Sequence, residues 1–308
     1  MTEKIVVVGS SNTDMIIKMS RIPKPGETII GGDFSTAAGG KGANQAVAAA
    51  RAGGDVTFIA RLGDDMFGRR ARDGFLAENI NVDHVIFDKQ FPSGVALIFV
   101  GEDGENSIGV ASGANAKLSV SDILAAKDAI ASADVLVMQL EIPLETVRAA
   151  AAIASENDVT VILNPAPAQE LHGEILRNVS ILTPNESEAR LLTGIEIESE
   201  QDAKVAADVL IEKGIESVLV TMGAKGVFVR TKNLTEVVPG FKVKVVDTTA
   251  AGDVFNGVLA VAIAEGKSLK EAVSFANAAA ALSVTKLGAQ PSAPARKEID
   301  EFLKNYKF

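Results

Sequence analysis

The sequence predicts an α/β fold, a three-layer αβα sandwich around a mostly parallel central sheet. Short apolar runs alternate with longer helical segments along most of the 308 residues. Several of these runs are almost entirely apolar, which is typical of strands that are covered by helices on both faces. Alternation of this kind implies right-handed crossovers, which place helices on both sides of a parallel sheet.

The predicted elements follow one another in a regular order. The apolar runs predicted as strands are 5–8, 56–60, 135–139, 160–163, 180–183, 218–221 and 227–230, and a further strand-like run covers 242–246. The predicted helices are 42–52, 67–78, 121–131, 144–156, 187–193, 201–213, 252–265, 269–285 and 295–304. Ser268 precedes Glu271 by three residues, which is typical of a capped helix start.

Two segments depart from this order and predict a small second sheet. Residues 15–34 alternate apolar and polar side chains around a Pro-Lys-Pro-Gly turn, and residues 93–110 read as a hairpin with its turn at 102–105. Both segments look antiparallel. We expect a single domain over residues 1–308, with a β lid formed by 15–38 and 93–110 whose exposed face can pair with a second copy. The alternative is a simple extension of the sheet edge.

Composition excludes several classes of function. The net charge of −10 argues against nucleic-acid binding, which usually needs a basic face. The absence of cysteine excludes disulfides and thiolate chemistry, and two histidines, His84 and His172, make a catalytic triad or a histidine-rich metal site unexpected. The first residues lack the pattern of a signal peptide, and no run reaches the ~18 apolar residues of a membrane helix. We therefore expect a cytoplasmic protein without membrane association.

Residues 247–257, Asp-Thr-Thr-Ala-Ala-Gly-Asp-Val-Phe-Asn-Gly, carry the strongest chemical signal. Small residues form a turn there, and a helix starts near Gly252. Backbone N–H groups at a helix N-terminus, together with its partial positive charge, bind anions. Because Asp253 lies in the first turn, the segment offers an anion cradle beside a carboxylate, which suits phosphoryl transfer to a hydroxyl. The alternative is that Asp253 only caps the helix.

Two glycine-containing clusters near the N-terminus predict ligand contacts. Residues 39–46, Gly-Gly-Lys-Gly-Ala-Asn-Gln-Ala, let backbone approach a ligand closely, although close helix packing explains the glycines equally well. This run does not match the P-loop pattern, since Ser35 and Gly42 stand at key positions. Residues 9–14, Gly-Ser-Ser-Asn-Thr-Asp, follow the first strand, where Asn12 and Asp14 can hold sugar hydroxyls or form a local turn. The missing Gly-x-Gly-x-x-Gly fingerprint disfavours a nicotinamide-dependent dehydrogenase.

Two further clusters follow later strands. Asn185 and Glu188 are three residues apart and share a helix face, where they can arrange hydrated Mg²⁺ or simply cap the helix. Residues 221–226, Thr-Met-Gly-Ala-Lys-Gly, form a glycine turn that can line a nucleotide or place Lys225 in solvent. Because every cluster follows a predicted strand, all of them can face one crevice at the carboxyl edge of the sheet.

The runs at 39–46 and 247–257 resemble the two signature segments of the ribokinase family of ATP-dependent carbohydrate and nucleoside kinases. The likeness covers essentially the whole chain and includes Met-Gln-Leu-Glu at 138–141 and Lys-Leu-Gly-Ala-Gln-Pro-Ser at 286–292. The last run, with Asn12-Thr13-Asp14, is most similar to the members that act on ribose. The resemblance implies ATP-dependent phosphorylation of D-ribose at its 5-hydroxyl, which gives ribose 5-phosphate and ADP.

The resemblance also implies a role for particular residues. Asp253 is the expected base, and the backbone of Ala250, Ala251 and Gly252 is the expected anion hole. The expected sugar site is Asn12, Thr13, Asp14, Gly40, Lys41, Gly42, Ala43, Asn44, Glu141 and Asp253. The expected ATP site is Asn185, Thr221, Gly223, Lys225, Gly226, Gly252 and Asn277, with Asn185 and Glu188 organising Mg²⁺ through water. The expected loop for K⁺, a monovalent activator, is Asp247, Thr249, Ser283, Lys286, Gly288 and Ser292, acting largely through backbone carbonyls.

The resemblance further implies a homodimer that pairs through the lid. One alternative function is a sister kinase that acts on deoxyribose, another sugar or a nucleoside. A second is a non-catalytic sugar sensor on the same fold. The sensor is disfavoured because Asp253, the anion-hole run and the Asn185–Glu188 pair are all present, and a sensor needs no base.

Overall fold

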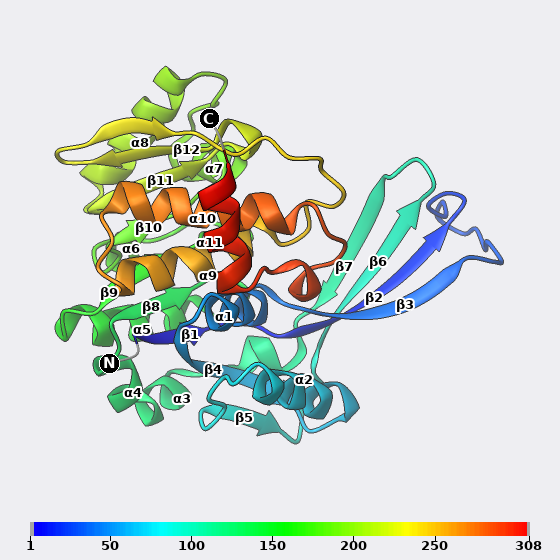
Figure 1. Ribbon diagram of the computed structural model, residues 1–308. Helices are drawn as coiled ribbons and strands as arrows, with labels where there is room; N and C mark the ends of the chain where they lie inside the picture. The colour runs from blue at the N-terminus through cyan, green and yellow to red at the C-terminus, as the bar shows by residue number, and fades with distance from the viewer. Residues whose placement is uncertain (1–2, 307–308) are drawn as a thin grey trace.

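The computed structural model describes residues 3–306. The first two and last two residues of the predicted domain 1–308 lie outside the described residues. The body has helices on both faces of a central sheet, and a small second sheet projects from it (Figure 1). This arrangement confirms the predicted fold class. No helix in the described part of the chain combines the length and apolar character needed to span a bilayer.

The central sheet is mostly parallel, as predicted. Within residues 3–306 it has nine strands in the order β13-β12-β11-β10-β9-β8-β1-β4-β5. Strands from β11 to β5 run parallel, whereas β12 and β13 form an antiparallel edge. The strand bounds are β1(Lys4–Val8), β4(Asp55–Gly63), β5(Val85–Asp88), β8(Val135–Met138), β9(Thr160–Leu163), β10(Ile181–Leu182), β11(Ser217–Thr221), β12(Val227–Thr231) and β13(Thr235–Val238).

The prediction differs from the structure at the sheet edges. The short edge strands β5 and β13 were not predicted, and the predicted strand 242–246 is wrong. That segment pairs with no strand. It is held instead by single contacts, such as the Lys242 N–H donating to the Tyr306 hydroxyl at 3.0 Å and the Val246 N–H donating to Val284 O at 2.7 Å.

Helices cover the two faces of the sheet in two groups (Figure 1). One face carries α1(Lys41–Arg51), α2(Met66–Ala77), α9(Ala251–Ala264), α10(Leu269–Ser283) and α11(Arg296–Asn305). The other carries α3(Val120–Ala125), α4(Lys127–Ala131), α5(Leu144–Glu156), α6(Gly173–Leu176), α7(Glu186–Thr193) and α8(Glu200–Glu212). The predicted helix 121–131 is wrong as one unit, because Ala126 leaves helical geometry at φ −99° and ψ 10° and separates α3 from α4. Short 3₁₀ turns occur at η1(Gly113–Lys117), η2(Gly223–Lys225) and η3(Gln290–Ser292).

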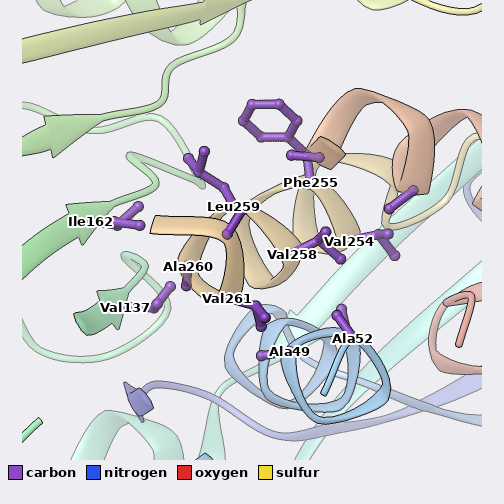
Figure 2. Packing of buried hydrophobic residues seen from close by; sticks show 14 of the residues in the cluster. Ala49, Ala52, Val137, Ile162, Val254, Phe255, Val258, Leu259, Ala260 and Val261 are labelled. Atoms are coloured by element: carbon purple, nitrogen blue, oxygen red, sulfur yellow. The ribbon is translucent and has the colours of Figure 1, made fainter. Parts of the chain in front are cut away.

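Helix α9 lies in the hydrophobic core on the face of the sheet that also carries α1 and α10. It packs against both the sheet and α1. Figure 2 shows Ala49 of α1 and Ala52, which directly follows α1, beside α9, with Val137 of β8 and Ile162 of β9 nearby. The two helices approach closely at Gly257, where an added Cβ would lie 2.4 Å from the carbonyl oxygen of Gln45. Glycine at this position therefore lets α1 and α9 pack closely where they touch.

The small sheet, called the lid sheet from here on, has the order β3-β2-β6-β7. Its strands are β2(Asn12–Met19), β3(Asp33–Gly39), β6(Gly94–Gly101) and β7(Asn106–Ala111), and the predicted hairpin at 93–110 is confirmed. The predicted antiparallel pairing within each segment is confirmed, since β2 pairs with β3 and β6 pairs with β7. The two segments meet through β2 and β6, which run parallel. Both strands start at the body, with Asn12 opposite Gly94, and both extend outward, so they must point the same way.

Candidate active site

Most of the strand-end clusters line one cavity, whereas Asn12 and Asp14 do not line it. A cavity of about 480 Å³ is lined by residues from all later clusters and by Lys41 of the first glycine run. It includes Asn185, Glu188, Thr221, Gly223, Ala250, Ala251, Gly252 and Asp253. The parallel strands end at the same edge of the sheet, which brings together segments that are far apart in the sequence.

The start of α9 has the backbone geometry expected of an anion cradle. Ala250 precedes the helix with φ 60°, a left-handed conformation that is uncommon for a residue with a side chain. The amides of Ala250 and Gly252 have no acceptor within residues 3–306, whereas the Ala251 N–H donates to Thr248 O at 3.3 Å. An added Cβ at Gly252 would meet open space. First-turn N–H groups without acceptors, facing a cavity, are suited to bind a phosphate.

Asp253 is buried beside this cradle, with 6% of its surface exposed. Its Oδ2 accepts a hydrogen bond from Asn44 Nδ2 at 2.9 Å, and its Oδ1 accepts one from Gln45 Nε2 at 3.0 Å. Burial raises the pKa of Asp253, while the charge of Lys41 and the two amide donors oppose the rise. A carboxylate that is oriented on both oxygens and has a raised pKa is suited to act as a general base.

The predicted sugar residues surround Asp253 on its other side. Burial, with the nearby charges of Glu141 and Asp253, raises the pKa of Asp14 to about 6. Glu141 accepts hydrogen bonds from the Lys41 N–H at 3.0 Å and from the Ser10 hydroxyl. The Oδ1 of Asn44 is buried without a donor among the described residues. A sugar hydroxyl can supply the donor that this oxygen lacks.

The sugar side also contains a residue that was not predicted. Asn115 Nδ2 donates to Asn12 Oδ1 at 2.8 Å, and Asn115 Oδ1 accepts from the Ser11 N–H at 2.9 Å. Asn115 therefore fixes the orientation of Asn12. The available signal in the sequence was a polar residue between alanines directly after the hairpin. Thr13, by contrast, alternates with Asn12 and Asp14 along β2, so its side chain lies on the opposite face of the lid sheet.

The glycines at the start of α1 allow close backbone contact. Gly40 has φ +89°, and an added Cβ there would lie 2.6 Å from the Asn12 nitrogen. A Cβ at Gly42 would lie 2.5 Å from the Ser10 nitrogen, and the Ala43 N–H donates to Ser10 O at 2.8 Å. These contacts place the first turn of α1 against the segment that follows β1. The close-packing interpretation of the glycines is therefore correct, and this packing brings Lys41 to the cavity and Asn44 to Asp253.

A second cavity, of about 470 Å³, adjoins the first and has mostly apolar walls. The two share Thr221, Gly223, Thr248, Ala251 and Gly252. Of the other predicted ATP residues, Gly226 and Asn277 line the second cavity and Asn185 lines the first, whereas Lys225 lines a separate cavity with Glu186. The sequence interpretation missed the apolar wall, which comes from Phe241, Val243, Val245, Phe255, Ala280 and Val284. An apolar recess that joins an anion cradle suits a base attached to phosphates.

Asn185 and Glu188 form a reciprocal helix cap at the start of α7. The Asn185 N–H donates to Glu188 Oε2 and the Glu188 N–H donates to Asn185 Oδ1, both at 2.8 Å. Burial raises the pKa of Glu188, although the Asn185 N–H and the charge of Lys41 oppose the rise. Across residues 3–306, no three His, Cys, Asp or Glu side chains are grouped closely enough to hold a metal directly. This arrangement fits Mg²⁺ that keeps its water shell, since Mg²⁺ gives up water reluctantly.

The predicted cation loop is closed by Asp247. Its carboxylate accepts from the Thr249 N–H at 2.9 Å, the Thr249 hydroxyl at 2.7 Å and the Gly288 N–H at 2.8 Å. Burial raises the pKa of Asp247, but these hydrogen bonds outweigh it and hold the pKa below its usual value. The buried Ser283 and Ser292 lie in the neighbouring segments. The Lys286 side chain does not join the loop, because it pairs with Glu298 at 2.8 Å.

Comparison with known proteins agrees with this geometry. A model of the "pfkB family carbohydrate kinase" matches residues 2–296. A ribokinase of Haemophilus influenzae is 50% identical over 99% of this chain and 100% of its own length, and a deoxyribokinase of Salmonella typhi is 38% identical over 97% and 98%. A solved Arabidopsis thaliana ribokinase, complexed with ribose and ATP, is 35% identical and has a TM-score of 0.91 over 99% of this chain and 100% of that one.

Proposed function

Because the chain belongs to the pfkB family of carbohydrate kinases, we propose that it transfers the γ-phosphoryl group of ATP to the 5-hydroxyl of D-ribose. The products are ribose 5-phosphate and ADP. The observation that carries this proposal is the buried Asp253 carboxylate, held on both oxygens, one residue from the unpaired amide of Gly252. The relatives named for ribose, at 50% and 35% identity, support the choice of sugar.

In this mechanism each group of residues has a separate role. Asn12, Asp14 and Asn44 hold the sugar so that its 5-hydroxyl faces Asp253. Asp253 accepts the hydroxyl proton as the oxygen attacks phosphorus. The amides at the start of α9 stabilise the charge on the transferred phosphoryl group. Lys41, which lies near both Asp253 and Glu188, adds a positive charge beside the reacting atoms.

Two cations complete the proposed site. Asn185 and Glu188 would hold the water shell of Mg²⁺, which would supply positive charge to offset the phosphates. K⁺ would lie in the loop closed by Asp247, next to the anion cradle, where it would fix the backbone geometry of residues 248–252. The oxygen-rich donors of this loop suit such an ion. Thr221, Gly223, Gly226 and Asn277 would line the nucleotide site.

We place the lid, residues 15–38 and 93–110, over the sugar within one domain, with its outer face in a homodimer. The β2, β3 and β6 registers put Met15, Ile17, Phe34, Leu97 and Phe99 on the face opposite to Asp14. Phe34 and Leu97 are 64% and 51% exposed. A second copy is the natural cover for such a self-complementary apolar face. The proposed location is the cytoplasm, where ATP is abundant.

Deoxyribose is the second candidate substrate. The Salmonella typhi deoxyribokinase is 38% identical over nearly the whole chain, and the two sugars differ by a single hydroxyl. A site that hydrogen-bonds a substrate hydroxyl rejects the analogue that lacks it strongly, because a buried polar group then stays unpaired. The ratio of kcat/KM for the two sugars therefore separates the candidates.

The decisive experiment measures ADP release with ribose, deoxyribose, fructose and adenosine, each with ATP, Mg²⁺ and K⁺. We expect the highest kcat/KM with ribose, and ³¹P NMR should show the product phosphorylated at the 5-position. A higher kcat/KM with deoxyribose or adenosine would overturn the choice of ribose. Sugar binding by calorimetry without any ADP release would instead support the sensor.

A further inference from the structure

Three neighbouring parallel strands each end in a buried polar side chain near the start of α9. Gln139 directly follows β8, Asn164 follows β9 and Thr183 follows β10. All three side chains are buried. Because the three strands are adjacent and parallel, these residues form a row along the carboxyl edge of the sheet. None of the site roles described above uses this row.

Gln45 of α1 joins the row to Asp253. Its Nε2 donates to Asp253 Oδ1 at 3.0 Å and to Asn164 Oδ1 at 3.2 Å. Its Oε1 accepts from Gln139 Nε2 at 2.7 Å. Gln45 is fully buried, so solvent does not compete for these hydrogen bonds. Gln139 therefore donates a hydrogen bond to Gln45, and Gln45 in turn donates one to the Asp253 carboxylate.

The row also reaches the anion-binding turn. Asn164 Nδ2 donates to Thr183 O at 3.2 Å, and the Thr183 hydroxyl donates to Asn256 Oδ1 at 2.7 Å. Asn256 Nδ2 then donates to Gly252 O at 2.8 Å. One continuous network therefore connects the sheet edge with both the carboxylate and the first turn of α9.

We propose that Gln45 is a positioning residue for phosphoryl transfer, which holds the Asp253 carboxylate through a hydrogen-bond network anchored at the ends of β8, β9 and β10. The inference rests on the proposed function for its catalytic meaning, since it assumes that Asp253 is the base. The claim that Gln45 holds the Asp253 carboxylate in place can be tested without any sugar.

The chemistry of the groups fixes the direction of the network. An ionised carboxylate only accepts hydrogen bonds, so Gln45 must turn its NH₂ group toward Asp253. The Gln45 oxygen then points into the buried row and needs a donor, which Gln139 supplies. Without Gln139 the Gln45 oxygen would stay buried and unpaired, which is unfavourable. Gln139 thereby selects the one amide orientation that supports the carboxylate.

Gly9 makes room for Gln139. An added Cβ at Gly9 would lie 2.2 Å from Gln139 Oε1 and 2.7 Å from the Gly42 Cα. The Gln139 Oε1 itself has no donor among residues 3–306. The donation to Gln45 is therefore the hydrogen bond that decides how the Gln139 amide is turned.

The test removes the Gln45 amide with the variant Gln45→Leu. Asp253 also faces Lys41, Asn44, Glu141, Asp14 and Glu188, and all of these stay in place. Loss of a donor to the ionised form raises the pKa of Asp253 further, so the acid limb of the kcat–pH profile should move to higher pH. We expect kcat at neutral pH to fall by about 10- to 100-fold, as for a lost hydrogen bond to a charged group, with little change in the sugar KM.

A second readout needs no activity. In protein labelled with [4-¹³C]aspartate, the Asp253 carboxyl signal is assigned by its loss in Asp253→Asn, and its titration is followed by NMR. We expect titration at higher pH in Gln45→Leu than in the unmodified protein. An unchanged titration, or a kcat that falls equally at every pH, would overturn the positioning role. Failure to phosphorylate ribose would overturn the proposed function alone, because this titration would still report on Gln45.

The matched control is Thr146→Val, which removes a buried hydrogen bond of 2.7 Å to Leu118 O between residues that line neither cavity. It should lower stability while leaving kcat and its pH profile unchanged. A shift of the acid limb in this control would also overturn the inference. Should Gln45→Leu not fold, Gln139→Leu carries the same test, with a smaller shift in the same direction because the Asp253–Gln45 contact is loosened rather than removed.

Discussion

A methyl group at position 257 should separate the two helices that carry Asp253 and its donors. The added Cβ in Gly257→Ala would lie 2.4 Å from Gln45 O, 2.9 Å from the Ala48 Cβ and 3.0 Å from the Ala49 nitrogen. The nearest of these contacts is backbone, which cannot rotate away. Since ordinary contact begins near 3.4 Å, α1 and α9 must move apart by about 1 Å.

This displacement acts directly on the carboxylate. The hydrogen bonds from Asn44 and Gln45 to Asp253, now 2.9 Å and 3.0 Å, would lengthen beyond the range in which hydrogen bonds are effective. Overpacking of this kind costs about 1–3 kcal/mol of stability. A misplacement of about 1 Å in a catalytic group costs about 10²-fold in rate. We therefore expect kcat to fall by about 10²-fold and the free energy of unfolding by about 1–3 kcal/mol.

The assay combines steady-state ADP release with urea unfolding. The matched control is Gly74→Ala in α2, where an added Cβ meets no atom within 4 Å. That control should keep its kcat and gain about 0.5–1 kcal/mol, because alanine suits a helix better than glycine. Wild-type kcat and stability in Gly257→Ala would refute the claim that the closeness of α1 and α9 positions the base.

Four further predictions concern other parts of the site. Asp253→Asn should lower kcat by about 10²–10⁴-fold while calorimetry still detects ribose binding, and near-normal turnover would contradict the base. The pKa of Asp14 is raised to about 6. The folded protein therefore loses stability as this carboxyl group ionises between about pH 4 and about pH 6. Asp14→Asn should therefore raise the melting temperature at pH 7 but not at pH 3, and raise the ribose KM; an equal gain at both pH values would contradict this. Replacing K⁺ with tetramethylammonium should lower kcat, and an unchanged rate would count against the loop at Asp247. Asn115→Ala should raise the ribose KM by about 10-fold by releasing Asn12, whereas a changed kcat alone would point elsewhere.

The parts of the fold that were predictable are those with a strong local pattern. Apolar or nearly apolar runs such as 135–138 and 160–163 indicate buried strands, and the structure confirms both. The run 242–246 alternates lysine and valine like a strand, yet Val243 and Val245 line a cavity instead of a sheet. Its alternation is real, but Val243 and Val245 face the second cavity. Edge strands β5 and β13 were missed because they are mostly half-buried and include a charged residue, so they lack the apolar pattern of β8.

The candidate site likewise has residues that could be predicted from a local pattern and residues that could not. The clusters around Gly40, Asn185 and Asp253 were found because glycines, caps and helix starts leave marks within a few residues. Gln45 and Asn115 were not found, because their partners are distant: Gln45 lies 208 positions from Asp253, and Asn115 lies 103 positions from Asn12. Nothing in the local sequence of either residue states which group it will meet. Their roles exist only once the sheet has brought its strand ends together.

The lid sheet and the proposed sugar site are built from the same backbone. Asn12, at the first position of β2, pairs with Gly39 at the last position of β3, and Asp14 is two residues further along β2. From Gly39 the chain passes through Gly40 directly into α1 and its Lys41 and Asn44. The lid is therefore not an appendage that evolution or an engineer can exchange alone. A lid transplanted from a relative would bring its own Asn12 and Asp14 positions with it, so a change of lid is also a change of sugar selectivity.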